Sequence, residues 1–356
     1  MKLMYVILTS LLFIVGCSSS HDEQKLQCNE VEFIKGFPKE ISLEKTAPLP
    51  LDLAGCVEIY GIDSLLICRI PEGEYLWKVY SLHDLRFLGN LFGRGHGHNE
   101  FVESFMPDMS ICTDSALFCE FWSFSNGGWY RCNLTESLRS KEIVWDREKL
   151  FQNSDLIHTN IYLDDSTFFM VRYNNYVGYI RSLCINGSIQ DMDYVGNLNT
   201  LYAEEDINTL SAVRCVNRKR MMVAEGMLRL NQINLYSLNS DSSKTLCVGD
   251  YLMDVVDTDK SPKIKRHKYY GYIVSYEDYF VALYNDVSYE SYFKGDGDSQ
   301  LQFFTWDGKP LLCIKLPCFV TSFFISKGRY LYIFSNGGEE EMMYKYDCGE
   351  LLQSII

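Results

Sequence analysis

A repeat of about 50 residues runs through most of this chain of 356 residues. Each copy is a polar turn followed by a short apolar strand, as in the Asp-Ser-Leu-Leu-Ile sequence of residues 63–67. The six turns are marked by Ser64, Ser115, Ser166, Lys219, Asp278 and Gly328. The steps between these markers are 51, 51, 53, 59 and 50 residues. A near-constant period of this length is typical of the blades of a β-propeller, and it predicts six equivalent units.

A second, aromatic-rich strand ends in a turn within each unit. Residues 79–84 and residues 304–309, the latter with an Asp-Gly pair, are examples. Asn-Gly and Asp-Gly pairs suit the tight turns that join antiparallel strands. The chain also has 25 Tyr and 21 Phe but only 8 Pro, and no long helical periodicity, which favours strands throughout. We therefore expect an all-β fold, a six-bladed β-propeller with four-stranded antiparallel blades.

A pair of β-sandwiches is the main alternative fold. It would also consist of short strands joined by turns, but it does not explain a sixfold period. A closed ring needs the last blade to pair with an N-terminal strand, so that no sheet edge stays unpaired. The candidates for that strand are residues 31–34 and 57–60.

The N-terminus has the pattern of a bacterial lipobox. Lys2 precedes an apolar run over residues 4–15, and Gly16 stands directly before Cys17. The run is too short to span a bilayer of about 30 Å. It therefore predicts a signal peptide at residues 1–16, with Cys17 becoming the lipid-bearing N-terminus after cleavage. A plain secretory signal, in which Cys17 is incidental, is the alternative.

The chain after the signal divides into a short polar segment and one long domain. Residues 17–30 carry three serines and three acidic residues, which predicts a lipid-anchored tether. Residues 31–356 show no linker, which predicts a single six-bladed propeller. An acyl chain such as palmitate on Cys17 would attach the protein to the outer membrane. Whether it faces the periplasm or the cell surface stays open.

A formal net charge of −14 sets limits on the partners. Nucleic acids and anionic membrane surfaces require a clustered basic face. The one basic run, residues 260–268, follows an acidic stretch and is predicted to be a solvated loop. Contact with the membrane is therefore expected only through the N-terminal lipid.

Twelve cysteines follow Cys17, and several of them lie within apolar strand-like runs. A free cysteine in such a run behaves as a small buried apolar side chain. There is no C-x-x-C motif, and Cys313 and Cys318 have no set of further ligands at zinc-site spacing. Most of the cysteines are therefore predicted to be core thiols.

A glycine-rich segment at residues 88–101 follows the first unit and contains Gly93, Gly95 and Gly97. Glycines permit close backbone approach, as a crossing between two blades requires. If the loop lies at the mouth of the channel instead, its polar side chains would face a ligand. The candidate ligand-binding residues are Arg94, His96, His98 and Glu100. A His-x-His pair could bind a metal, but no third ligand is identified and Arg94 would oppose a cation.

Here the chain resembles a group of Bacteroidetes lipoproteins with a TolB-like six-bladed propeller. Those proteins carry a segment of the form G-x-G-x-G-P-x-E-F, which matches residues 92–101 except that His98 takes the place of proline. The similarity in repeat layout covers about residues 50–350. The resemblance implies the fold and an envelope location more than an activity.

No catalytic or cofactor motif is complete. The segment 294–300 has alternate aspartates but too few oxygen ligands for an EF-hand, so no cofactor is expected, with calcium the one alternative. G-x-S-x-G, H-E-x-x-H, Walker and Rossmann motifs are absent from the sequence. Acidic residues could still converge at the channel mouth, or simply cap turns; these are Glu100, Asp114, Asp165 and Asp278.

These observations predict a non-enzymatic, lipid-anchored binding module for an envelope protein or a small ligand. Loops on a rigid scaffold are the usual place for such recognition. A calcium-assisted lactonase or esterase is the alternative, and it requires carboxylates gathered at one end of the channel. Carbohydrate binding would require clustered tryptophans, whereas the five tryptophans are scattered through the sequence.

Overall fold

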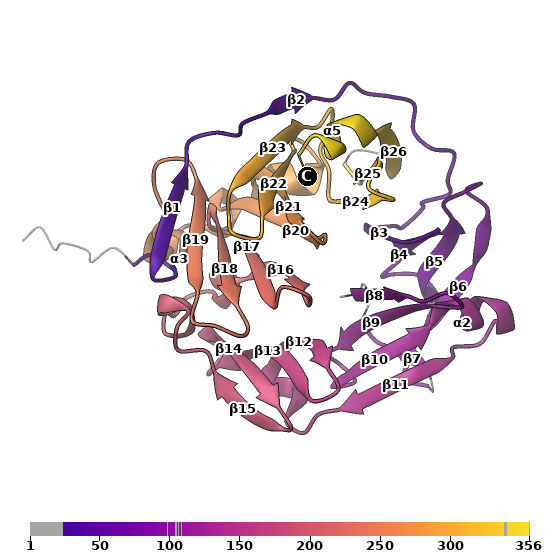
Figure 1. The fold of residues 1–356 in the computed structure, drawn as a ribbon, viewed down its shortest axis with the longest axis horizontal. Coiled ribbons are helices and arrows are strands. Elements are labelled where there is room, and N and C mark those ends of the chain that lie inside the picture. The colour runs from indigo at the N-terminus through magenta and orange to yellow at the C-terminus, as the bar shows by residue number, and fades with distance from the viewer. Residues whose placement is uncertain are drawn as a thin grey trace, which may run out of the picture.

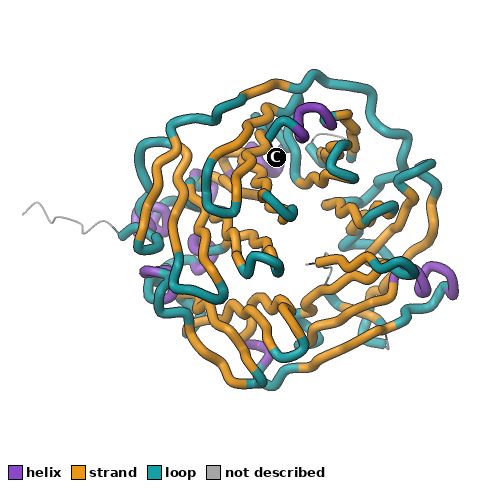
Figure 2. The backbone as a smooth tube through the Cα atoms, viewed as in Figure 1, coloured by secondary structure: helices purple, strands orange, loops and turns teal. Residues whose placement is uncertain are grey.

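Six small sheets stand radially around a central axis in the computed structural model (Figure 1). The structure describes residues 24–97, 99–103, 105, 107, 109–337 and 340–355. Figure 2 shows that strands form most of each blade, while helices are short and lie between or beside the sheets. The predicted all-β, six-bladed propeller is confirmed.

The first three blades follow one another along the chain. Blade 1 contains β3 (Glu58–Ile62), β4 (Leu65–Arg69), β5 (Tyr75–Ser81), β6 (Phe87–Arg94) and β7 (Glu100–Phe101). Blade 2 contains β8 (Met109–Cys112), β9 (Leu117–Ser123), β10 (Gly128–Asn133) and β11 (Trp145–Leu150), with α2 (Leu134–Ser140) before β11. Blade 3 contains β12 (Ile157–Asp164), β13 (Thr167–Asn174), β14 (Gly178–Ile185) and β15 (Ser188–Asp191).

The other three blades complete the ring. Blade 4 contains β16 (Ala212–Asn217), β17 (Met222–Met227), β18 (Gln232–Ser237) and β19 (Ser243–Val248), followed by α3 (Val255–Lys260). Blade 5 contains β20 (His267–Ser275), β21 (Tyr279–Ser288), α4 (Tyr289–Lys294), β22 (Gln300–Thr305) and β23 (Pro310–Lys315). Blade 6 contains β24 (Ser322–Ser326), β25 (Tyr330–Ser335) and β26 (Met342–Asp347), followed by α5 (Gly349–Gln353).

The sixfold repeat marks one equivalent place in every blade. Each of the six turn markers lies in the hairpin between the innermost strand and the second strand, for example Ser64 between β3 and β4. Gly328, the last marker, lies in the same way between β24 and β25. The repeat is therefore a repeat of one hairpin, because tight turns demand particular residues at fixed positions.

The expectation of four strands in every blade is wrong. Blades 2 and 3 have four strands, blades 1, 4 and 5 have five, and blade 6 has three. In blades 4 and 5 the fifth strand comes from the N-terminal segment, as β1 (Glu30–Ile34) and β2 (Glu40–Ser42). In blade 6 the chain forms α5 after β26 rather than a fourth strand.

The N-terminal residues 24–57 form a strap around the outside of blades 4, 5 and 6 (Figure 1). The strand β1 pairs in parallel with β19, and β2 pairs in parallel with β23. Farther along, the backbone N–H of Leu49 donates to the carbonyl of Met343 in blade 6 (2.8 Å). The strap therefore covers outer sheet edges that would otherwise expose unpaired backbone groups.

Ring closure differs from the expectation that residues 31–34 or 57–60 pair with the last blade. The first range lies in β1 on blade 4, and the second leads into β3, the innermost strand of blade 1. In the described part of the chain, blades 6 and 1 are not joined by strand pairing. Their contact includes a hydrogen bond in which the N–H of Ile59 donates to Ser322 Oγ (2.9 Å). A Cβ on Gly61 would lie 2.2 Å from the Phe324 ring, so glycine permits this close approach.

Residues 24–30 pack against the propeller, although the sequence places the start of the propeller domain at residue 31. Leu26 and Cys28 are each 1% exposed. The N–H of Gln24 donates to Asp254 Oδ2 (2.6 Å), and the N–H of Cys28 donates to Thr245 Oγ1 (2.9 Å). The polar composition of this stretch predicted a tether; Leu26 and Cys28 pack in the apolar cluster between blades 3 and 4, and these hydrogen bonds also hold the stretch.

The twelve cysteines of the described residues are free, and ten of them are buried. This confirms that most are core thiols. Cys119 and Cys132 face each other from the neighbouring strands β9 and β10. Cys112, at the end of β8, is the exposed exception.

Replacing Leu26 with alanine should destabilise the fold, because it removes the apolar contact that docks the start of the strap. Truncating a buried leucine costs about 2–5 kcal/mol. The Ile264→Ala variant is the matched control, since Ile264 is 59% exposed and such a surface change stays within about 0.5 kcal/mol. Urea unfolding of both variants measures the effect. Equal midpoints for the two variants would contradict docking of the strap.

Candidate functional site

A pocket of about 530 Å³ occupies the central channel of the propeller. Its walls come from the innermost strands β3, β12, β16 and β20, and from the end of β9. The crossover from blade 1 to blade 2, including residues 103, 105 and 107, completes the wall. Volumes of about 300–1,000 Å³ are usual for small-molecule sites, so the pocket is large enough for an organic ligand.

Aromatic rings supply much of the pocket's apolar surface. The rings that line it belong to Tyr60, Phe105, Trp122, Phe124 and Tyr272. Phe124 lies in the turn that follows β9 and is 47% exposed. Large exposed rings beside buried ones offer a ligand apolar contact at little cost in side-chain entropy.

Glu103 places a carboxylate in the wall formed by the crossover. Its Oε1 atom accepts hydrogen bonds from Ser123 Oγ (2.8 Å) and from the backbone N–H of Ser125 (2.9 Å). Burial raises the pKa of Glu103, but the hydrogen bonds from Ser125 and Ser123 outweigh it and hold the pKa below its usual range. The side chain is therefore an anion at neutral pH.

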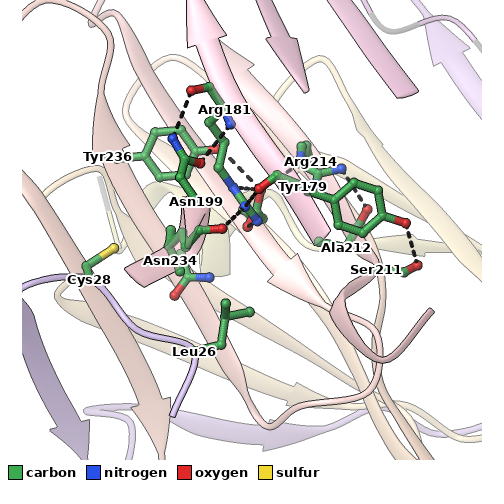
Figure 3. A network of polar contacts seen from close by, with 12 residues as sticks. Leu26, Cys28, Tyr179, Arg181, Asn199, Ser211, Ala212, Arg214, Asn234 and Tyr236 are labelled. Carbon is green, nitrogen blue, oxygen red and sulfur yellow. Dashed lines mark hydrogen bonds and ion pairs between the residues drawn. The ribbon is translucent and has the colours of Figure 1, made fainter. Parts of the chain in front are cut away.

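Arg214 lies on the opposite side of the channel, in β16, and belongs to a buried charged cluster. Its Nε donates to Glu225 Oε2 (2.6 Å), while Arg181 Nη2 donates to Glu225 Oε1 (2.6 Å). The Tyr236 hydroxyl adds a bond to Glu225 Oε2 (3.2 Å). Figure 3 shows Arg181 of blade 3 and Arg214 of blade 4 converging from neighbouring blades. Two guanidiniums thus share one carboxylate.

The cluster keeps Glu225 ionised despite complete burial. Burial alone would raise the pKa of Glu225, but the charges of Arg181 and Arg214 and their hydrogen bonds lower it to about 2. Losing Glu225 would instead leave two guanidiniums buried without a counter-ion. The cluster therefore joins blades 3 and 4 beside the pocket wall.

His158 stands next to this cluster at the start of β12. Its ring packs edge-on against Tyr179 (5.1 Å between ring centroids), and its Nδ1 lies 2.9 Å from Thr159 Oγ1. Burial, followed by the positive charge of Arg214, lowers the pKa of His158 to about 4. The imidazole is therefore neutral at pH 7.

A second cationic group lies beside the pocket at the start of β20. Burial, followed by the charge of Arg229, lowers the pKa of Lys268 to about 7. The Lys268 Nζ atom lies 3.6 Å from the centre of the Tyr292 ring in α4. Glu58 lines the pocket nearby, and its Oε2 is 2.8 Å from Arg69 Nε.

Of the residues predicted from the glycine-rich segment, Arg94, His96 and Glu100 do not line the pocket. Arg94 Nη1 donates to Glu72 Oε2 (3.1 Å), and this pair is at the surface. His96 is exposed. His98 and the predicted lipid attachment site Cys17 lie outside the described residues.

Glu100 explains why this segment contains so many glycines. Its carboxylate folds back over the loop and accepts the N–H of Gly97 at Oε2 (2.8 Å). A Cβ on Gly95 would lie 2.1 Å from Glu100 Oε2, and a Cβ on Gly97 would lie 2.9 Å from it. The glycines therefore make room for a side chain of their own loop, as the crossover interpretation expects.

The other acidic candidates do not come together. Asp114, Asp165 and Asp278 lie in the first hairpin turns of three different blades, and Asp165 and Asp278 pair with Arg147 and Arg220. Across the described part of the chain, no three His, Cys, Asp or Glu side chains are grouped as a metal site would require. Within the same part, no helix is long and apolar enough to cross a membrane.

The sequence singled out the glycine-rich segment and missed Glu103, His158 and Arg214. A signal for the last two was present in the repeat. Innermost strands directly precede the repeated hairpin turns, so charged residues shortly before a turn marker face the axis or a neighbouring blade. No comparable local signal distinguishes Glu103.

Comparisons with known proteins agree with the fold. A member of the DUF4221 family from Bacteroides vulgatus has a TM-score of 0.53 at 12% identity, over 85% of this chain and 97% of its own. A protein named as exported, from Bacteroides fragilis, has a TM-score of 0.45 at 10% identity, over 86% and 88% of the two chains. Regucalcin from Agrobacterium tumefaciens, named as calcium-binding, has a TM-score of 0.42 at 10% identity, over 86% and 94%.

Comparisons with protein-family models and with curated proteins find no match. At identities this low, the structural likeness is a likeness of fold. The first of these structures supports the propeller architecture, and none of the three assigns an activity to this chain.

Replacing Glu225 with glutamine should destabilise the protein at pH 7, because both buried arginines lose their carboxylate. Breaking a buried ion pair on one side costs about 3–5 kcal/mol. The folded pKa of about 2 lies below the ordinary value of 4.5, so this stabilisation is complete above pH 4.5 and is lost as the pH falls towards 2. The difference in unfolding free energy between wild type and variant should therefore decrease as the pH falls below 4.5.

Denaturant unfolding at pH 7, 5 and 3 measures this gap. Glu277→Gln is the matched control, because Glu277 pairs with Lys219 at the surface and is 65% exposed. It should change stability little at any of these pH values. A Glu225→Gln variant as stable as the control at pH 7 would contradict the role of the cluster.

Proposed function

We propose that this chain is a lipid-anchored binding module of the cell envelope that takes up a small organic ligand in its central channel. The pocket of about 530 Å³ carries this proposal. It combines several aromatic rings with a few polar groups from different blades, which is the usual composition of a ligand site.

The arrangement of the blades supports binding in the channel. The strands that form the wall belong to packed sheets, so a ligand would meet preorganised side chains and lose little affinity to ordering the protein. The crossover residue Phe105 is 7% exposed and stacks on Phe121 with ring centroids 3.9 Å apart, so this part of the wall is braced by the blade 2 interior.

A ligand screen on the detergent-solubilised full-length protein tests this proposal. The panel contains sugars, amino acids, short peptides, nucleosides and carboxylic acids, with thermal shift as the first measurement. Hits are confirmed by titration calorimetry and by a change in tryptophan emission, because Trp122 lines the pocket.

Phe124→Ala should weaken the binding of any confirmed ligand by about tenfold, which corresponds to about 1.4 kcal/mol. Phe33→Ala is the matched control, because Phe33 is 44% exposed on β1, the outermost strand of blade 4, and Phe124 is 47% exposed. Equal loss in both variants, or no ligand from any class, would contradict the proposal. A ligand bound only with calcium would favour the metal-assisted hydrolase.

The lipid anchor has a separate test. Cys17→Ala should move the protein from the membrane fraction to the soluble fraction, because it removes the acylated residue. Fractionation of cells expressing either form, followed by immunoblotting, measures this. A variant that still partitions with membranes would contradict acylation at Cys17.

A further inference from the structure

Two charged side chains in opposite walls of the channel pocket each keep one buried polar atom without a partner. These atoms are Arg214 Nη2 and Glu103 Oε2, which have no hydrogen-bond partner among the residues that the structure describes. Both residues line the pocket. A buried polar group without a partner is unfavourable, and more so when it is charged. The pocket therefore holds two polar atoms that a ligand could satisfy.

Arg214 provides the cationic side of the pocket. Its Nε is bound to Glu225 and its Nη1 to the carbonyl of Ala212 (3.2 Å), which leaves Nη2 unmatched. The side chain is only 4% exposed. Glu225 is shared with Arg181, so the cluster carries one positive charge in excess. An acidic group of a ligand would accept a hydrogen bond from Nη2 and would balance the excess positive charge of the cluster.

Glu103 provides the anionic side. Its Oε1 is held by Ser123 and Ser125, which fixes the orientation of the carboxylate and leaves Oε2 free to accept. An ammonium group of a ligand suits this carboxylate, because it would donate a hydrogen bond to Oε2 and would balance its negative charge.

The two groups lie on different sides of the channel. Arg214 belongs to β16 in blade 4, and Glu103 follows β7 on the crossover to blade 2. β7 lies at the outer edge of blade 1, and β8, which follows the crossover, is the innermost strand of blade 2 and lies across the axis from β16 (Figure 1). A single ligand that satisfies both must therefore carry its acidic and basic groups at opposite ends.

The geometry points to a short peptide with free termini as the ligand, with its carboxylate at Arg214 Nη2 and its ammonium at Glu103 Oε2. This inference rests on the proposed function of the channel pocket. Aromatic rings of the same pocket, among them Trp122 and Tyr272, would contact an apolar side chain of the peptide. Neutral His158 and the Thr159 hydroxyl lie beside the carboxylate end and add no negative charge.

Four forms of one tripeptide test the inference. Titration calorimetry on the detergent-solubilised full-length protein compares Ala-Phe-Ala with free termini, with an amidated C-terminus, with an acetylated N-terminus, and with both ends blocked. Each single block should weaken binding about tenfold or more, because each removes one charged end. Equal affinity for the free and the doubly blocked peptide would overturn the inference.

Two conservative variants test which residue binds which terminus of the peptide. Arg214→Lys keeps a positive charge towards Glu225 but lacks the second nitrogen arm, so it should weaken the free and acetylated peptides and leave the amidated peptide nearly unchanged. Glu103→Gln should weaken the free and amidated peptides and leave the acetylated one nearly unchanged. Arg220→Lys, at a surface pair with Asp278, is the control and should change none of them.

The outcomes separate this inference from the proposed function. Circular dichroism and thermal melting confirm that each variant is folded, and the peptide series on the wild-type protein decides the question if one is not. Sugars or nucleosides that bind and respond to Phe124→Ala, with no binding of the free tripeptide, would overturn the peptide inference and leave the pocket function in place. If no compound of any class binds, both the peptide inference and the proposed function of the pocket are overturned.

Discussion

The need to cover both faces of every sheet is the constraint on which this molecule depends. Each blade packs against two neighbours through large apolar side chains, such as Trp77, Phe92 and Phe121 between blades 1 and 2. The faces are thereby buried, but the inner and outer edges of each sheet remain. The strap covers outer edges of blades 4 and 5 by adding a parallel strand to each. The inner edges line the channel, where the walls of the pocket combine rigid backbone with side chains from several blades.

Much of the fold could be predicted from the sequence, because the information for it is local. A tight turn requires particular residues, so the six hairpins could be located to within a residue or two. The path of the strap could not be predicted in this way. The alternation of residues 30–34 indicates a strand, but nothing in it specifies β19 as the partner, 214 positions away for the pair Glu30 and Lys244. The number of strands in a blade depends on such distant additions, which is why the prediction of four failed.

The site was harder to predict than the fold for the same reason. The glycine-rich segment is conspicuous in the sequence, yet its glycines serve Glu100, a residue of the same loop. The pocket residues come from separate blades, and each of them is ordinary in its own strand. Arg214 gains its importance from Glu225 in the next strand and from Arg181 in the preceding blade. Such a charge balance exists only after the ring has assembled.

The strap also sets an order of events during synthesis. Glu30 pairs with Lys244, and Glu40 pairs with Cys313, so the segment that leaves the ribosome first must wait for partners made more than 200 residues later. Contacts this distant in sequence are slow to form, because the intervening chain must first be ordered. Until then the outer edges of blades 4 and 5 stay open to other strands. During this delay β1 and β2 must not pair elsewhere. Both are short strands that begin with a charged residue, Glu30 or Glu40, and such features disfavour pairing with other strands.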